Sequence, residues 1–335
     1  MAQKIRWGII STANIGTRKV IPGMKRSERG TVEAIASRDA GRARSAAAEL
    51  GIPKAYGSYE ELLADPDIDA VYNPLPNNLH VDWTLKAVEA GKHVLCEKPI
   101  GMNAEDAARL KAVAGRRHVM EAFMVRQHPQ WLRARELIRD GRIGELRAVQ
   151  VFFAYDNRDP DNIRNKPETG GGALLDIGCY GIVSGRFSFS AEPSRVVSLI
   201  DRDSAFGTDR LSSVIADFGG GRQLTFTVST QIAAHQRVTL AGTRGRIEVL
   251  IAFNAPQMEA TRILIDDGSG LGGASSVEEV IPPADQYAEQ ADTFARAVLG
   301  ETELPYGVDD AVRNMQILDA IFRSEQSGRW ESTGL

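Results

Sequence analysis

Short apolar runs alternate with longer amphipathic stretches over the first third of the chain. The runs have the length of buried strands, and the stretches between them carry apolar residues at helical spacing. Strands that alternate with helices favour a doubly wound parallel sheet. The pattern therefore predicts an α/β domain over residues 1–123, with strands at 5–10, 32–36, 70–75, 93–96 and 119–123 and helices at 13–24, 40–50, 58–64, 78–90 and 103–114.

The pattern changes after about residue 124. One further helix at 131–140 is followed by segments in which apolar and polar residues alternate, as in half-buried strands. Glycine-rich turns at 219–221 and 242–245 predict hairpins between such strands. We expect an α+β domain with a mainly antiparallel open sheet over residues 124–335, with strands at 146–154, 196–199, 213–218, 223–228, 237–241 and 246–250 and final helices at 287–299 and 308–327.

Composition narrows the function classes. The 335 residues hold 40 Lys and Arg against 44 Asp and Glu, a net charge of -4, so the chain has no overall attraction for nucleic acid or an anionic membrane. Two cysteines, Cys96 and Cys179, suit a reduced compartment. The absence of a long apolar run and of a leader-like start predicts a cytoplasmic protein.

A dinucleotide-binding pattern falls on the first strand-to-helix turn. In residues 8–16 the three positions of the glycine fingerprint are Ser11, Ala13 and Gly16. Serine and alanine are small enough for the turn if the φ angle stays negative, and the helix N-terminus would then bind a pyrophosphate. An ordinary βα turn is the alternative interpretation.

The residues after the second predicted strand bear on cofactor choice. Ser37-Arg38-Asp39 follows Gly16 at about the 20-residue spacing at which such domains meet the adenosine ribose. A guanidinium suits a ribose 2′-phosphate, so Arg38 favours NADP over NAD. The alternative is that Arg38 is a solvated loop residue and Asp39 selects NAD.

A further motif carries a family resemblance. Cys96-Glu97-Lys98-Pro99 follows a buried strand, and with residues 57–62 it resembles the Gfo/Idh/MocA oxidoreductase family. Residues 121–129 and 170–180 resemble the branch that holds glucose–fructose oxidoreductase, NADP-dependent D-xylose dehydrogenase and dimeric dihydrodiol dehydrogenase. Many relatives have histidine where this chain has Tyr180.

The resemblance implies site residues and a Rossmann fold for the first domain. Lys98, Asp176 and Tyr180 would be catalytic, and these three would bind substrate together with His128 and Arg164. The implied cofactor-binding residues are Ser11, Thr12, Ala13, Asn14, Ile15, Ser37, Arg38, Leu75, Pro76, Asn77, His80, Glu97, Lys98 and Arg126.

Hydride transfer from an alcohol also needs an acceptor for the hydroxyl proton. A phenol is a poor base at neutral pH unless a nearby cation favours the phenolate, so we expect Lys98 and Tyr180 to act as a couple. Asp176 lies four residues before Tyr180, which places both on one helix face. Gly178 and Gly181 admit either close approach of a ligand or close core packing.

Other residues give weaker signals. The five histidines show no paired metal-ligand spacing, so no metal is predicted, and the two cysteines fit a packing role. Residues 157–166 form either a cover over the pocket or a solvated loop.

Together these observations predict an NADP-dependent oxidoreductase that acts on a sugar or polyol. It would oxidise an aldose at C1 to the lactone or reduce a keto-sugar. An aldose–aldose oxidoreductase that does not release NADP and a non-catalytic nucleotide-sensing regulator are the alternatives. We expect a homodimer or homotetramer through the C-terminal sheet, with the alternating sets Val149, Val151, Phe153 and Leu224, Phe226, Val228 as candidates for an open apolar face.

Overall fold

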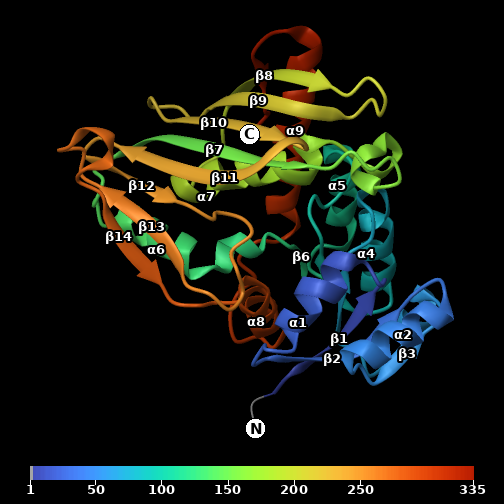
Figure 1. Ribbon diagram of the computed structural model, residues 1–335. Helices are drawn as coiled ribbons and strands as arrows, with labels where there is room; N and C mark the ends of the chain where they lie inside the picture. The colour runs from blue at the N-terminus through green and yellow to red at the C-terminus, as the bar shows by residue number, and fades with distance from the viewer. Residues whose placement is uncertain (1–2) are drawn as a thin grey trace. The chain divides into compact units, whose positions relative to one another are not determined.

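The computed structural model describes residues 3–335 and divides into two compact units (Figure 1). Residues up to 124 form the first unit together with residues 285–312, and residues 125–284 and 313–335 form the second. Residues 285–312 join the first unit because helix α8 (Gln286–Val298) packs on it, with Phe294 5.3 Å from the ring of Trp7. The assignment of separate cofactor and substrate domains stays a prediction.

A six-stranded parallel sheet forms the centre of the first unit. Its strand order, β3-β2-β1-β4-β5-β6, is that of a doubly wound Rossmann sheet, which confirms the predicted fold class. The short strand β3 escaped the sequence analysis because its three residues are only half-buried and form no apolar run. The strands are β1 (Ile5–Ile10), β2 (Gly30–Ala36), β3 (Lys54–Tyr56), β4 (Ala70–Asn73), β5 (His93–Cys96) and β6 (Val119–Glu121).

Helices connect these strands and begin at recognisable caps. Ser58 accepts a hydrogen bond from the Glu61 amide at 3.1 Å, and the Glu61 carboxylate accepts one from the Gly57 amide at 3.0 Å. Side chains thus satisfy amides that the first helical turn leaves unpaired. The helices are a π-helical turn (Gly16–Val20) leading into α1 (Ile21–Met24), α2 (Ala40–Leu50), α3 (Tyr59–Ala64), α4 (His80–Glu89) and α5 (Ala104–Ala108).

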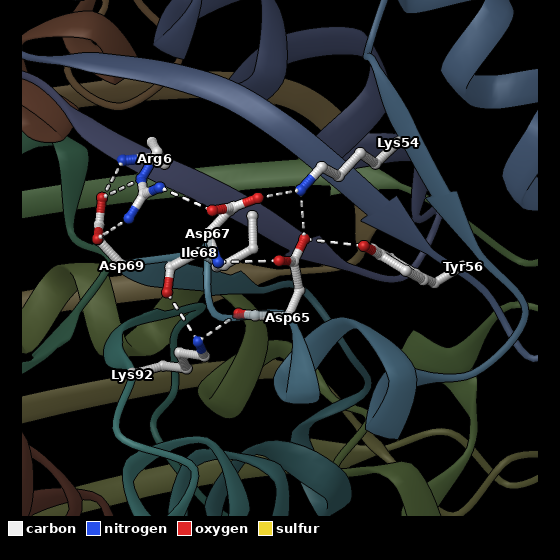
Figure 2. A network of polar contacts seen from close by, with 8 residues as sticks. All are labelled: Arg6, Lys54, Tyr56, Asp65, Asp67, Ile68, Asp69 and Lys92. Atoms are coloured by element: carbon white, nitrogen blue, oxygen red, sulfur yellow. Dashed lines mark hydrogen bonds and ion pairs between the residues drawn. The ribbon is translucent and has the colours of Figure 1, made fainter.

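Charged residues fix the loop that precedes β4 at the amino edge of this sheet (Figure 2). Arg6 donates two hydrogen bonds to Asp69 at 3.0 and 2.9 Å, and Lys54 binds Asp65 and Asp67 at 2.9 Å each. The buried ammonium of Lys92 donates to two backbone carbonyls of the same loop. This network lies opposite the carboxyl edge, where the predicted cofactor residues follow the strands.

The second unit is built on a nine-stranded mixed sheet, in the order β14-β13-β12-β11-β7-β10-β9-β8-β15. Among the described strands β7 and β10 pair parallel and the other neighbours pair antiparallel, as predicted in the main. The strands are β7 (Leu146–Asp156), β8 (Arg195–Arg202), β9 (Asp209–Asp217), β10 (Gln223–Ser229), β11 (Gln231–Gly242), β12 (Gly245–Val249), β13 (Thr261–Asp266), β14 (Val277–Ile281) and β15 (Glu331–Ser332). The helices are α6 (Pro129–Arg139), α7 (Cys179–Phe189) and α9 (Val308–Ser327). Helix α9 starts in the first unit and ends in the second.

One face of the nine-stranded sheet packs against α7. A Cβ atom at Gly181 would lie 2.8 Å from the ring of Phe226, and one at Gly185 would lie 2.9 Å from Leu224. Close core packing therefore explains Gly181, one of the two glycines for which ligand approach was an alternative. The apolar sets proposed for an open face are wrong in this respect, because both lie on the buried face and are at most 6% exposed: Val149, Val151, Phe153, Leu224, Phe226 and Val228.

The opposite face of the sheet carries a different apolar set. Leu199 is 78% exposed and Ile215 is 43% exposed, although both lie on strands of the sheet. With Val197, Thr225 and Thr227 they line a shallow hollow of about 340 Å³.

Candidate active site

The turn after β1 has the backbone conformation that the glycine fingerprint supplies. Ser11 has φ +98°, so the condition of a negative φ is not met at this position, and serine occupies a region that favours glycine. Its hydroxyl accepts a hydrogen bond from the Ala13 amide at 3.0 Å, which helps to hold the turn. Backbone strain of this kind concentrates at functional sites.

The helix that follows this turn leaves room at its N-terminus. A Cβ atom at Gly16 would come no closer than 3.6 Å to Tyr72 and 3.7 Å to Pro74, an ordinary contact. Packing within the protein therefore does not require glycine here. A glycine that leaves the helix N-terminus bare fits a pyrophosphate on the unpaired amides.

Asp39 is engaged with its own helix. It caps α2, and its carboxylate accepts hydrogen bonds from the amides of Arg42 and Gly41, which lower its pKa. Ser37 is buried and accepts a hydrogen bond from the Asp39 amide at 3.2 Å. Arg38 between them is exposed. Of the three, Arg38 is the residue best placed to meet a charged group from solvent.

Glu97 and Lys98 follow β5 at the same edge of the sheet. Tyr72, on β4, donates its hydroxyl proton to Glu97 at 2.6 Å, and the other carboxylate oxygen lies 3.3 Å from the Lys98 amide. Both residues are half-buried. The loop after β4 contributes Leu75, which is buried, and Pro76 and Asn77, which are half-buried.

His80 contacts both the loop after β4 and the loop after β5. Its ring is 1% exposed, and its two nitrogens lie 2.7 Å from the carbonyl oxygen of Pro99 and 2.6 Å from that of Leu75. Burial lowers the pKa of this imidazole to about 4. This geometry favours a role in positioning the loops over the direct cofactor contact predicted for His80.

In the second unit, Asp176 lies in a π-helical turn (Leu174–Gly178) that leads into α7. Single π-helical turns within helices occur frequently at functional sites. The Asp176 carboxylate is 9% exposed, accepts a hydrogen bond from the Tyr155 hydroxyl at 2.5 Å and pairs with the Arg164 guanidinium at 3.1 Å. Burial and the Asp176 charge both raise the pKa of Tyr155.

Arg164 comes from the segment at residues 157–166, which its own hydrogen bonds hold in place. Asn165 is buried and donates to the carbonyls of Asn157 at 3.2 Å and Asp159 at 2.8 Å. The Arg164 carbonyl accepts from the Gly172 amide at 2.9 Å. The segment is thus fixed beside the start of the helix and brings Arg164 to Asp176.

Tyr180 lies in the first turn of α7 within an aromatic wall. It is 5% exposed, and its ring centroid lies 5.9 Å from that of Phe153 and 5.3 Å from that of Phe253. The two phenylalanines stack on each other at 4.6 Å. The Tyr180 ring thus packs beside two phenylalanines, and the Asp176 network lies four residues earlier on the same helix.

Two family models match the chain. The model described as an oxidoreductase family with an NAD-binding Rossmann fold covers residues 5–126, and the model of the GFO/IDH/MocA C-terminal domain covers residues 131–248. The chain belongs to the Gfo/Idh/MocA oxidoreductase family. This confirms the resemblance inferred from residues 96–99 and establishes the protein as an oxidoreductase with a nicotinamide nucleotide cofactor.

Relatives within the family span nearly the full length of the chain. A D-xylose 1-dehydrogenase (NADP⁺) of Haloferax volcanii is 39% identical over 96% of this chain and 98% of its own. The 3-ketoreductase KijD10 from Actinomadura kijaniata, solved with NADP and TDP-benzene, is 30% identical with a TM-score of 0.88 over 96% of this chain and 98% of its own. An aldose–aldose oxidoreductase from Caulobacter crescentus, solved with glycerol, is 26% identical with a TM-score of 0.90 over 98% of this chain and 100% of its own.

Arg126 and His128, two of the predicted contact residues, lie in the interior. Arg126 is 4% exposed and His128 is 0% exposed. The His128 Nδ1 atom accepts a hydrogen bond from the Gln130 amide at 3.1 Å and so caps α6. Their contacts with cofactor or substrate stay predictions.

The two cysteines lie in the interior of the protein. Both cysteines are buried thiols, and burial raises the pKa of Cys96 well above its usual value. Over residues 3–335, histidine, cysteine, aspartate and glutamate form no group of three or more that could hold a metal ion. No helix in the same range has the length and apolar character needed to cross a bilayer. The cytoplasmic location stays a prediction.

Sequence reasoning missed Tyr155 and Phe253. Tyr155 lies one residue beyond the predicted end of its strand, and the alternation that places Phe153 inward continues to it along β7. Phe253 lies in a loop after β12, where no periodic pattern marks it.

Proposed function

We propose that the protein transfers a hydride between NADP and a sugar. The observation that carries this proposal is the Asp176 carboxylate, bonded to Tyr155 and Arg164 on the helix that also carries Tyr180. Sugars are recognised largely through their hydroxyl groups, which need charged and polar partners of this kind beside apolar rings. Relatives named for D-xylose and for sugar ketones support the same substrate class.

The residues at the carboxyl edge of the first sheet fit the cofactor. When bound, the nicotinamide accepts or donates the hydride. The helix after Ser11 would hold the pyrophosphate, and Arg38 would meet the ribose 2′-phosphate because Asp39 is committed to its helix. The predicted remaining contacts are Thr12, Ala13, Asn14, Ile15, Ser37, Leu75, Pro76, Asn77, Glu97, Lys98 and Arg126.

Tyr180 would transfer the proton, and Lys98 would be its charged partner. In the oxidising direction the Tyr180 phenolate takes the hydroxyl proton of the sugar as the hydride leaves its carbon, and in the reducing direction the phenol returns a proton to the carbonyl oxygen. The Lys98 ammonium would favour the phenolate and bind the reacting oxygen.

Asp176 would orient the sugar. An ionised carboxylate accepts hydrogen bonds from hydroxyl groups but donates none, so it selects a donor on the substrate. Arg164 would balance its charge, and His128 is a further predicted substrate contact.

Two candidate reactions differ in whether the cofactor is released after each turnover. An aldose dehydrogenase releases reduced cofactor after each turnover, whereas an aldose–aldose oxidoreductase, as in the Caulobacter relative, would alternate oxidation and reduction on retained NADP. A non-catalytic sensor is less well supported, because it requires neither Lys98 nor Tyr180.

A substrate panel tests the proposal. Aldoses and keto-sugars are assayed with NADP, NADPH, NAD and NADH by nicotinamide absorbance, and the denatured protein is examined for bound nucleotide. Turnover with free NADP supports the dehydrogenase or ketoreductase. Retained nucleotide with turnover only in aldose pairs supports the alternative. No turnover with any sugar, in either format, contradicts the proposed function.

A further inference from the structure

One buried carboxylate in the second unit has no role in the proposed mechanism. Asp209 is the first residue of β9 and is 2% exposed. Its Oδ2 atom accepts a hydrogen bond from the Leu174 amide at 2.7 Å and one from the Ser212 hydroxyl at 3.1 Å. A side chain from a strand thus binds an amide in the first turn of a helix 35 residues earlier in the chain.

Two glycines before the helix leave room for this contact. Gly172 has φ +114°, and a Cβ atom there would lie within 2.0 Å of the Asp209 Oδ1 atom. A Cβ atom at Gly171 would lie 2.5 Å from the carbonyl oxygen of Arg164. The two glycines therefore let the chain pass between Asp209 and the Arg164 segment, and any larger residue at 172 would displace the carboxylate.

An anion is well suited to this position. The helix that begins here continues through α7 to Phe189, and the unpaired amides at its start carry a partial positive charge. The groups that face the carboxylate are the Leu174 amide, the Ser212 hydroxyl and, by its charge, Arg202 on β8. Burial without a close ion pair is nevertheless costly for a carboxylate, so packing alone does not account for an aspartate.

We propose that Asp209 is a positioning residue that fixes where this helix begins, and so places Asp176 and Tyr180. Asp176 lies two residues after the capped amide, in the same π-helical turn, and Tyr180 follows one turn later. This inference rests on the proposed function in that Tyr180 and Asp176 are taken as the groups that contact the sugar.

The two ionisation states of Asp209 have opposite effects on stability and activity. Burial raises its pKa to about 7. A raised carboxyl pKa contributes stability that is present at low pH and is lost as the pH rises through about 7. The ionised form, however, is the stronger acceptor for the Leu174 amide. Turnover should therefore fall as the pH drops through about 7, while the protein becomes more stable.

Asp209→Asn tests this signature, with Asp217→Asn as the matched control on the same strand. Asp217 is partly exposed, and its carboxylate bonds the Gly219 amide and the Arg195 guanidinium instead of an amide of the helix. We expect Asp209→Asn to lower kcat by roughly 10- to 100-fold, the scale of a misplaced catalytic group, and to leave the KM for NADP unchanged. Its melting temperature at pH 8 should equal or exceed that of the wild type, and the acid limb of its kcat profile should be lost.

Asp217→Asn should retain the wild-type kcat and acid limb. If Asp209→Asn keeps both as well, the proposal is wrong. A variant that loses stability at pH 8 together with activity also contradicts it, because that result indicates a purely structural carboxylate.

Amide hydrogen exchange separates this proposal from the proposed function. Faster exchange over residues 173–178 in Asp209→Asn, but not in Asp217→Asn, supports the positioning role even if no sugar is turned over. Unchanged exchange in both variants overturns it. The less disruptive Ser212→Ala, which removes one bond and leaves the Leu174 amide paired, should change exchange and kcat by less than Asp209→Asn.

Discussion

Tyr155 donates its hydroxyl proton to Asp176 at 2.5 Å, from the end of a strand to a turn 21 residues further along the chain. Arg164 pairs with the same carboxylate oxygen at 3.1 Å. Two donors on one oxygen fix the direction of the carboxylate, so under the proposed mechanism Tyr155 would influence how the sugar is oriented without touching it.

Tyr155→Phe removes this hydrogen bond and keeps the ring. A hydrogen bond to a charged group is worth about 1.5–3 kcal/mol, so kcat/KM for the sugar should fall by roughly 10- to 100-fold while the KM for NADP stays constant. Tyr56→Phe is the matched control, because Tyr56 makes the same kind of bond to Asp65 in the first unit. An unchanged kcat/KM for Tyr155→Phe would show that Asp176 is oriented by other groups.

Arg38→Ala should weaken NADP binding far more than NAD binding. The lost contact to a 2′-phosphate is charge-assisted, at about 1.5–3 kcal/mol, whereas NAD has no phosphate at that position. Titration of both cofactors measures the difference. Equal weakening would mean that Arg38 only stacks on the adenine, and no weakening would remove it from the cofactor site.

Tyr180→Phe should lower turnover by roughly 10²–10⁴-fold with little change in cofactor affinity, because the ring still fills its space. Lys98→Met should also lower turnover and move the basic limb of the pH profile upward, since the phenol loses a favourable cation. In the double variant the loss should be little more than in the worse single one, as for residues that act together. Tyr180→Phe with most of its turnover intact would assign the proton to another group.

Leu199→Arg should dissociate a homodimer formed through the open face of the C-terminal sheet. Leu199 and Ile215 are the exposed apolar residues of the hollow on that face, and a buried arginine there would be unpaired. Light scattering at low micromolar concentration should give twice the chain mass of 36.4 kDa for the wild type and the single mass for the variant. Leu132→Arg, at an exposed leucine of α6, is the control. A monomeric wild type would refute the dimer.

Lys92→Met should lower the free energy of unfolding without changing turnover. The Lys92 ammonium donates to the carbonyls of Asp65 at 2.6 Å and Ile68 at 2.8 Å. The Asp65 carbonyl keeps its bond from the Ile68 amide at 3.3 Å, and a buried acceptor left unsatisfied costs about 1–3 kcal/mol. Denaturant unfolding measures the loss. Lys111→Met, at a half-exposed lysine paired with Asp309, should change stability by less than about 1 kcal/mol.

Local periodicity was enough to predict most of the fold. The strands at 5–10 and 93–96 and the helices at 40–50 and 308–327 have the predicted bounds, because each has a strong apolar pattern between clear caps or turns. Strands β13 and β14 were missed because charged residues interrupt their apolar positions. They pair because the hairpin before them provides an edge to extend.

The site was predictable only as far as sequence motifs reach. Asp176 and Arg164 were identified from the resemblance, but Tyr155 and Asp209 act through contacts with residues 21 and 35 positions away, which no local pattern encodes. The backbone conformation of the first turn was not predictable from the sequence either. Serine at the first glycine position of the fingerprint does not by itself indicate the positive φ of Ser11, whose amide bonds the Ala36 carbonyl of the next strand.

The imidazole of His80 has a mechanical consequence for the first unit. Because its two nitrogens contact the carbonyls of Leu75 and Pro99, the loop that carries Asn77 and the loop that carries Lys98 share one anchor. A neutral imidazole has one N–H, so His80 donates to one of the two carbonyls and lies against the other, and either loop would lose a buried contact by moving away from it. If the dinucleotide binds at this edge as proposed, the two loops would present one connected rim to it, and the opening needed for its release would come from another part of the chain.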